Sequence, residues 1–98
     1  MSDEAPIAID LPQALDLEAA RAWREAVLGA IRARQGVAAD AGRVLELTTE
    51  GLQALIVGAR ALSAAGLDFT LRRPSDPLIG AIEDLGLFPV MMDWTITD

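Results

Sequence analysis

Short apolar segments that alternate with longer helix-like segments are the feature that most limits how this chain can fold. Ile7, Ile9 and Leu11 alternate with small or polar residues, which is the period of a strand with one apolar face. Further strands are predicted at 37–39 and 67–72. Because a helix-like segment follows each strand, we expect an α/β fold in β-α-β-α-β-α order, with a mostly parallel or mixed sheet.

Each predicted helix has apolar residues at helical spacing on one side. The first helix is expected over 17–33 after the N-cap Asp16, the second from the threonine pair to about residue 65, and the third over 77–85 after the N-cap Asp76. The residues expected to face inward are Ala20, Trp23, Val27, Ala30 and Ile31, then Leu52, Leu55, Ile56, Ala59 and Leu62, then Leu78, Ile79, Ile82 and Leu85.

The predicted strands are not apolar throughout. A parallel sheet with helices on both faces has continuous apolar strands, but polar residues such as Asp10, Asp68 and Arg72 interrupt these. We therefore expect the helices mainly on one face of the sheet. Residues 87–94 are predicted to be a last strand or a docked tail, with Met91, Met92 and Trp94 packed over the core.

The composition limits the chemistry available to this protein. A chain of 98 residues that is 52% hydrophobic can form one core, so residues 1–98 are predicted to be a single domain. Cys, His and Tyr are absent, which excludes disulfides, Cys/His zinc sites and histidine acid–base catalysis. We therefore expect a protein that is not an enzyme and that has no cofactor and no metal.

The charge and hydropathy of the chain limit its partners and its location. The net charge is −7, from 8 arginines and 15 acidic residues, which disfavours nucleic acid and anionic membranes as ligands. No apolar run approaches the ~20 residues that a membrane-spanning helix needs. The first residues lack the basic and apolar regions of a signal peptide. We expect a cytoplasmic protein without membrane insertion, and the sequence leaves the oligomeric state open.

The junction Thr48-Thr49-Glu50-Gly51-Leu52 marks the start of the second predicted helix. Either threonine is a candidate N-cap, and a phosphate on either would be stabilised by the free N–H groups of the first turn. Glu50 complements the helix dipole or resembles a phosphorylated side chain. Since glycine in a helix costs about 1 kcal/mol relative to alanine, a neighbouring strand or a partner protein is expected to approach Gly51 closely.

Two further clusters have alternative interpretations. A second face of the same helix has only small side chains, which either seat a partner helix or, as we favour, pack against the first or third helix; its residues are Ala54, Gly58, Ala61 and Ala65. Asp40, Glu46 and Glu50 are a candidate magnesium site near the carboxyl ends of strands. Acidic residues spread through a loop are more commonly solvated, so that interpretation is favoured.

Four segments taken in order resemble the STAS domain, the module of anti-sigma factor antagonists. The resemblance spans about residues 11–87 and implies a sheet with helices on one side and a protein-binding role. The segments are Leu15-Asp16-Leu17 before an Ala/Arg-rich helix, 37–44 with Asp-Ala-Gly-Arg-Val, 48–53 with Gly-Leu-Gln, and 66–87 with a Pro-Ser turn and a final Leu-Gly-Leu.

The resemblance also implies where a partner would bind. Docking is expected through Thr48–Arg60, where the family has Asp-Ser-Ser-Gly-Leu. Glu50 takes the phospho-acceptor position and cannot be phosphorylated, which leaves Thr49 as a possible acceptor. The expected partner-binding residues are Thr48, Thr49, Glu50, Gly51, Gln53, Val57 and Arg60.

Two kinds of protein partner follow from this resemblance. The chain is similar to degenerate STAS proteins associated with bacterial chemotaxis, which implies signal transduction and a signalling kinase or anti-sigma-like protein as the partner. It is also similar to the small STAS subunits of lipid-transport ABC systems, which implies docking on an ATPase subunit. A carboxylate enzyme with bound magnesium is the third and least favoured alternative.

Overall fold

The computed structural model describes residues 5–98 and contains a parallel sheet of four strands in the order β1-β3-β5-β6. All of its strand pairings are parallel, as are those of a separate pair, β2-β4. The strands are β1 Ile7–Asp10, β2 Ala14–Leu15, β3 Val37–Asp40, β4 Glu46–Leu47, β5 Phe69–Arg72 and β6 Thr95–Thr97. The expected α/β fold with a mostly parallel sheet is confirmed. Residues 1–4, on which the signal-peptide prediction partly depends, lie outside the described residues.

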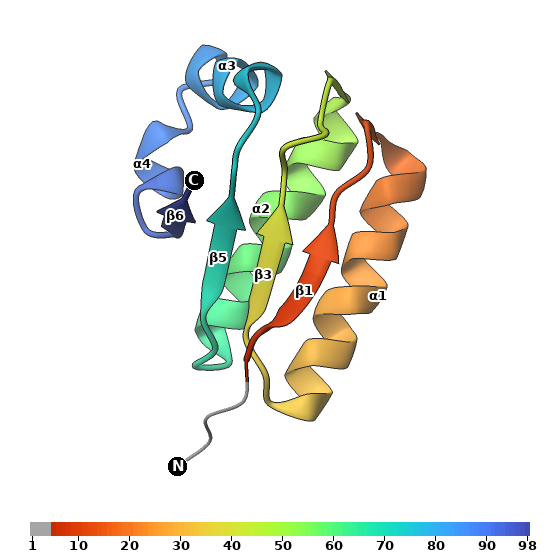
Figure 1. The fold of residues 1–98 in the computed structure, drawn as a ribbon, viewed down its shortest axis with the longest axis vertical. Coiled ribbons are helices and arrows are strands. Elements are labelled where there is room, and N and C mark those ends of the chain that lie inside the picture. Colours follow the sequence, from red (N-terminus) through yellow and green to blue (C-terminus); the bar gives the residue numbers. More distant parts are fainter. Residues whose placement is uncertain (1–4) are drawn as a thin grey trace.

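The long helices cover one face of the sheet. In Figure 1, α2 (Thr49–Ala64) lies behind β3 and β5 and α1 (Leu17–Ala33) lies next to α2 alongside β1, while the front face has no helix over it. The short helices α3 (Asp76–Asp84) and α4 (Phe88–Met91) lie at one end and one edge of the sheet. The prediction of helices mainly on one face is therefore confirmed. Within residues 5–98, no helix combines the length and apolar composition that crossing a bilayer requires.

The core lies between the sheet and these helices. On the central strand, Val37 and Ala39 are fully buried, and Phe69 on β5 packs edge-on against Trp23 of α1 with ring centroids 5.8 Å apart. β3 carries small side chains, such as the buried Ala39, which occupy little volume and so allow the helices to pack close to the strand. The predicted inward residues are buried or partly buried, except that Leu85 is 58% exposed.

The third helix begins and ends one residue earlier than predicted. Ser75 is its N-cap, and its hydroxyl oxygen accepts a hydrogen bond from the Leu78 backbone N–H at 3.3 Å. Asp76 is the first helical residue, so the prediction that it is the cap was wrong. The helix ends at Asp84, and the chain turns away at Gly86 with φ 67°. Leu85 therefore points outward rather than into the core.

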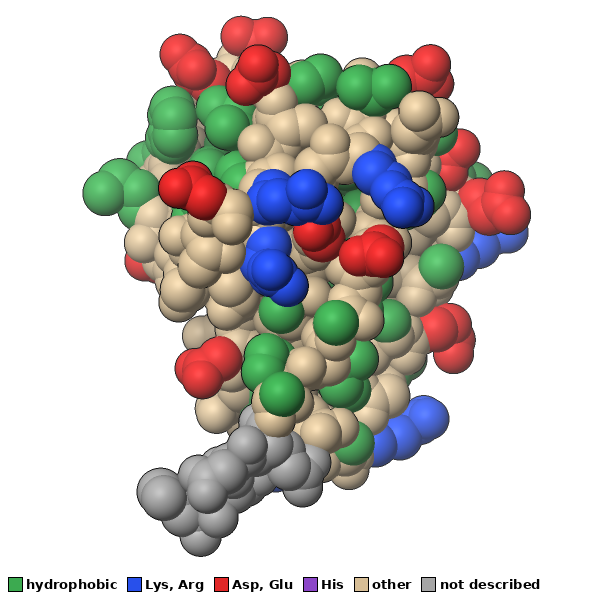
Figure 2. Space-filling model, viewed as in Figure 1, with side chains coloured by type: hydrophobic (Ala, Val, Ile, Leu, Met, Phe, Trp, Pro, Cys, Tyr) green, Lys and Arg blue, Asp and Glu red, His purple; other side chains and the backbone are tan. Residues whose placement is uncertain are grey.

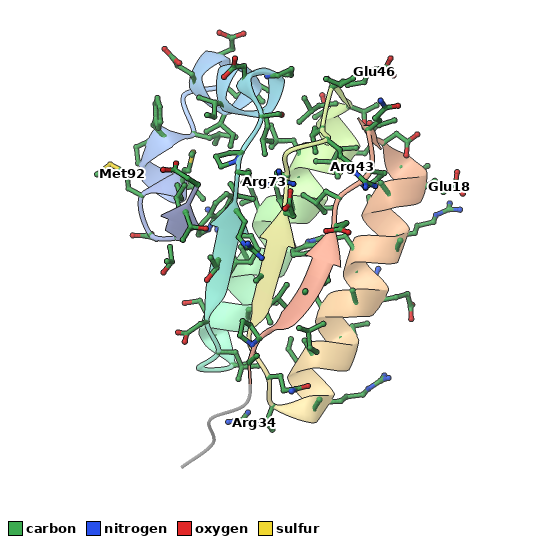
Figure 3. All side chains as sticks on the ribbon, viewed as in Figure 1. Glu18, Arg34, Arg43, Glu46, Arg73 and Met92 are labelled. Carbon is green, nitrogen blue, oxygen red and sulfur yellow. The ribbon has the colours of Figure 1, made fainter. Side chains whose placement is uncertain are left out.

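Of the two alternatives for the C-terminal segment, the docked tail is found. Residues 87–94 contain the helical turn α4 rather than a strand, and β6 starts only at Thr95. Met91 is buried, and the Trp94 ring packs edge-on against Phe69 at 5.1 Å, as expected for a segment over the core. Met92 is 79% exposed and projects away from the molecule (Figure 3), so the expectation was wrong for that side chain.

Candidate docking surface

The first turn of α2 is held tightly next to the first turn of α1. Thr48 is the N-cap of α2, and its hydroxyl oxygen accepts a hydrogen bond from the Gly51 N–H at 3.1 Å. The Thr48 backbone N–H donates to the Leu15 carbonyl at 3.1 Å. Asp16, which follows Leu15 in the chain, caps α1: its side-chain carboxylate accepts a hydrogen bond from the Ala19 N–H at 3.0 Å. Both helix starts are therefore fixed to the short β2-β4 pair, which leaves them little freedom to move apart.

Gly51 is buried because the backbone of β2 lies against it. A Cβ at this position would overlap the carbonyl of Leu15. Of the two alternatives that the sequence left open, the neighbouring strand explains why glycine is needed here. Gly51 is therefore the one predicted partner-binding residue that is not exposed.

The other predicted partner-binding residues lie on the solvent side of α2 and its cap. Thr49, Gln53 and Val57 follow at four-residue intervals and so form one row along the helix. Val57 is 63% exposed, which is high for an apolar side chain on a helix that is otherwise packed into the core. We call this surface the α2 row; its exposed residues are Thr48, Thr49, Glu50, Gln53, Val57 and Arg60.

The small side chains of α2 seat the ring of Trp23. The indole Nε1–H donates a hydrogen bond to the Ala54 carbonyl at 3.0 Å. A Cβ at position 58 would overlap the same indole, so only glycine fits under it. The favoured interpretation of this face, packing against α1, is confirmed for Ala54 and Gly58.

An open groove of about 600 Å³ runs between α1 and α2, beside the α2 row. Leu17 is 53% exposed and Leu28 38% exposed, so apolar side chains on α1 line it together with Val57 of α2. This groove was not among the sites predicted from the sequence. The signal was present, because Leu17 and Leu28 are apolar residues outside the inward set of the first helix. The lining residues are Leu17, Ala20, Arg21, Trp23, Arg24, Val27, Leu28, Glu50, Gln53, Ala54, Val57, Gly58 and Ala61.

A charged cluster lies on the helix-free face near the carboxyl ends of the strands (Figures 2 and 3). The Oδ2 atom of Asp40 accepts a hydrogen bond from the Arg73 Nε–H at 2.9 Å, and Arg73 Nη2 lies 2.9 Å from the same oxygen in a salt bridge. The other carboxylate oxygen of Asp40 accepts from the Gly42 N–H at 2.9 Å. The Gly42 bond first, and then the Arg73 bond, lower the pKa of Asp40 because they stabilise the carboxylate. This pair was not predicted, since no local pattern links the two residues.

The structure does not assemble the candidate magnesium site. Asp40 is paired with Arg73, and Glu46 lies at the top of the view in Figure 3, beyond the end of the four-stranded sheet. The part of the chain from residue 5 onward contains no group of three or more acidic side chains placed to hold a metal ion. Glu50 belongs instead to the first turn of α2, where it complements the helix dipole.

Comparison with known proteins finds similarity in structure but not in sequence. No family model matches the chain, and no curated protein matches its sequence. Among solved structures, the chain is similar to the crystal structure of a protein from Thermotoga maritima described as a proposed anti-sigma factor antagonist. The two are 16% identical with a TM-score of 0.71, over 93% of this chain and 79% of that chain. At this identity the likeness concerns the fold alone, and it confirms that the chain has a STAS-like fold.

Proposed function

We propose that this protein is a non-catalytic regulatory module that binds another protein through Thr48–Arg60. The observation that supports the proposal most is the α2 row, an exposed surface on a helix whose first turn is fixed by the Thr48 cap and by Gly51. A surface that is already ordered loses little conformational entropy when it binds. The STAS-like fold supports the same role, because the similar structure is described as a proposed anti-sigma factor antagonist.

The two threonines of the junction differ in their suitability for regulation. The Thr48 hydroxyl accepts from the Gly51 N–H and also donates to the Leu15 carbonyl at 3.5 Å, so a phosphate there would remove the donated bond and place negative charge beside that carbonyl. Thr49 is exposed at the first position of α2, where the helix dipole favours a phosphate. Any phosphate that a partner kinase adds is therefore expected on Thr49, while Glu50 keeps a permanent negative charge at the position next to it.

We place the module in bacterial signal transduction linked to chemotaxis, acting in the cytoplasm as a single domain. Its partner would be a signalling kinase or an anti-sigma-like protein. The alternative is a small subunit of a lipid-transport ABC complex, for which the partner would be the ATPase subunit. Both alternatives use the same α2 row, so identification of the partner distinguishes them.

The proposal is tested by affinity purification from the native cell followed by mass spectrometry. Thr49→Arg and Gln53→Arg each put a large charged side chain into the α2 row. Ser63→Arg is the matched control, because it adds the same side chain to an exposed position of the same helix outside Thr48–Arg60. We expect the first two variants to lose the partner and the control to keep it. If every partner stays bound to all three variants, the α2 row is not the docking surface.

A further inference from the structure

We infer that the groove between α1 and α2 binds an amphipathic helix of the partner protein whose flank facing α1 is acidic. This inference rests on the proposed function and makes it more specific, because Glu50, Gln53 and Val57 belong both to the α2 row and to the groove lining. The partner would contact the two helices together, rather than α2 alone.

The shape of the groove fits a helix. Its floor consists of small side chains, such as Ala54 and Ala61, next to the edge of the buried Trp23 ring. Small residues at a helix contact allow a third helix to approach closely. The exposed side chains of Leu17, Leu28 and Val57 stand along its length, where they would meet apolar residues repeated at three- and four-residue intervals.

The lining of the groove carries a net positive charge, although the whole chain carries a net negative charge. The net charge is −7, yet the charged residues that line the groove are Arg21, Arg24 and Glu50. Arg21 and Arg24 lie three residues apart on α1, so they face the same side of it. Neither forms an ion pair within the described residues. They would pair with acidic residues on one flank of the incoming helix, while Glu50 favours a basic residue at the end near the first turns.

A designed peptide tests this chemistry directly. The probe is a helical peptide of 17 residues, the length of α1, with apolar residues at i, i+3, i+4 and i+7 and glutamates along one flank. Its twin has lysines in place of the glutamates. Each is titrated into the isotope-labelled full-length protein and followed by NMR. We expect the acidic peptide to shift amide signals of residues that line the groove and to bind at least about threefold more tightly than the lysine twin.

Two arginine variants serve as a matched pair in the same titration. Arg24→Glu changes a groove residue, whereas Arg32→Glu makes the same charge change on α1 outside the groove. Arg24→Glu should abolish or reverse the preference for the acidic peptide, and Arg32→Glu should leave it unchanged. Equal binding of the two peptides, shifts outside the groove, or the same effect from both variants would overturn the inference.

A second pair of variants separates this inference from the proposed docking surface. Ala61→Leu fills the groove floor at a position outside Thr48–Arg60, and Ala64→Leu adds the same bulk to an exposed position of α2 that does not line the groove. We expect only Ala61→Leu to release the native partner. If Thr49→Arg releases that partner but Ala61→Leu does not, docking through the α2 row stands and the groove inference fails. A homodimer in sedimentation that Ala61→Leu disrupts would also overturn it, because a second copy would then cover the groove.

Discussion

Trp23 of α1 and Gly58 of α2 are packed so closely that position 58 has no room for a side chain. The indole also donates its Nε1–H to the carbonyl of Ala54, at 3.0 Å. Because the same ring touches Phe69 on the sheet, it joins α1, α2 and β5. This contact sets the separation of the two long helices and thereby the width of the groove between them.

The substitution Gly58→Ala is expected to destabilise the protein. The new methyl group must displace the buried indole, and overpacking of this kind costs about 1–3 kcal/mol, which exceeds the gain in helix propensity of about 1 kcal/mol except at the lower end of that range. Gly29→Ala is the control, because a Cβ at that position of α1 meets nothing within 4 Å. It should stabilise the protein by up to about 1 kcal/mol. Urea unfolding of both variants measures the difference; equal free energies of unfolding would contradict the packing described.

The substitution Gly51→Ala is expected to cost more than Gly58→Ala. Here the obstacle is the Leu15 backbone rather than the end of a side chain, so β2 and the first turn of α2 must separate. We expect a loss of about 3 kcal/mol. For a domain of this size that lowers the thermal midpoint by roughly 12 °C or more, as measured by circular dichroism. Gly80→Ala in α3, where a Cβ meets nothing within 4 Å, should show no such loss, and a similar loss in both variants would refute the explanation.

The two junction threonines should respond differently to substitution by alanine. Thr48→Ala removes the cap hydrogen bond to the Gly51 N–H and should lower the free energy of unfolding by about 1 kcal/mol. Thr49→Ala should change it by less than about 0.5 kcal/mol, because that side chain is exposed. Thr48→Ser keeps the hydroxyl and should restore most of the loss in the same denaturant titrations. A larger effect at Thr49 than at Thr48 would reverse the assignment of the cap.

Asp40 should contribute to stability in a pH-dependent way. Its pKa in the folded protein is lowered from the ordinary value of 3.8, so the unfolded chain binds this proton more readily. The contribution is therefore present above about pH 4 and is lost as the pH falls through the lower folded value. Asp40→Asn should show a shallower loss of stability below pH 4 than the unchanged protein. Denaturant titrations at a series of pH values measure both slopes, and identical slopes would contradict this role.

The effects of the Gly42 and Arg73 hydrogen bonds on the pKa of Asp40 can be compared by removing one of them. In Arg73→Gln the pKa of Asp40, followed by carboxyl NMR, should rise toward the ordinary value of 3.8 but remain below it. The Gly42 N–H bond persists in that variant and is the larger cause of the shift. A complete return to 3.8 would show that Arg73 is the main cause instead.

Much of the fold was predictable because it follows from short-range patterns. Asp16 was predicted as a cap, and the second cap was narrowed to Thr48 or Thr49, because each capping oxygen accepts from an N–H group only three residues further along. Capping at 75–76 was harder to predict, because Ser75 and Asp76 are both good caps and stand next to each other. The strand β6 was not predicted, because a three-residue strand has too little pattern to be separated from its flanks.

The candidate site shows where such patterns stop being informative. Residue order and apolar spacing already predicted alternating strands and helices and a sheet with helices mainly on one face. They also located the exposed start of the second helix. The composition showed that Cys and His are absent. Three contacts depend on three-dimensional packing: Gly51 against Leu15, Gly58 against Trp23, and Asp40 with Arg73. Each joins segments about 30 residues or more apart, and the depth and charge of the groove follow from how α1 and α2 meet. A local pattern reports only neighbours within a few residues, whereas such contacts exist only once the helices have docked on the sheet.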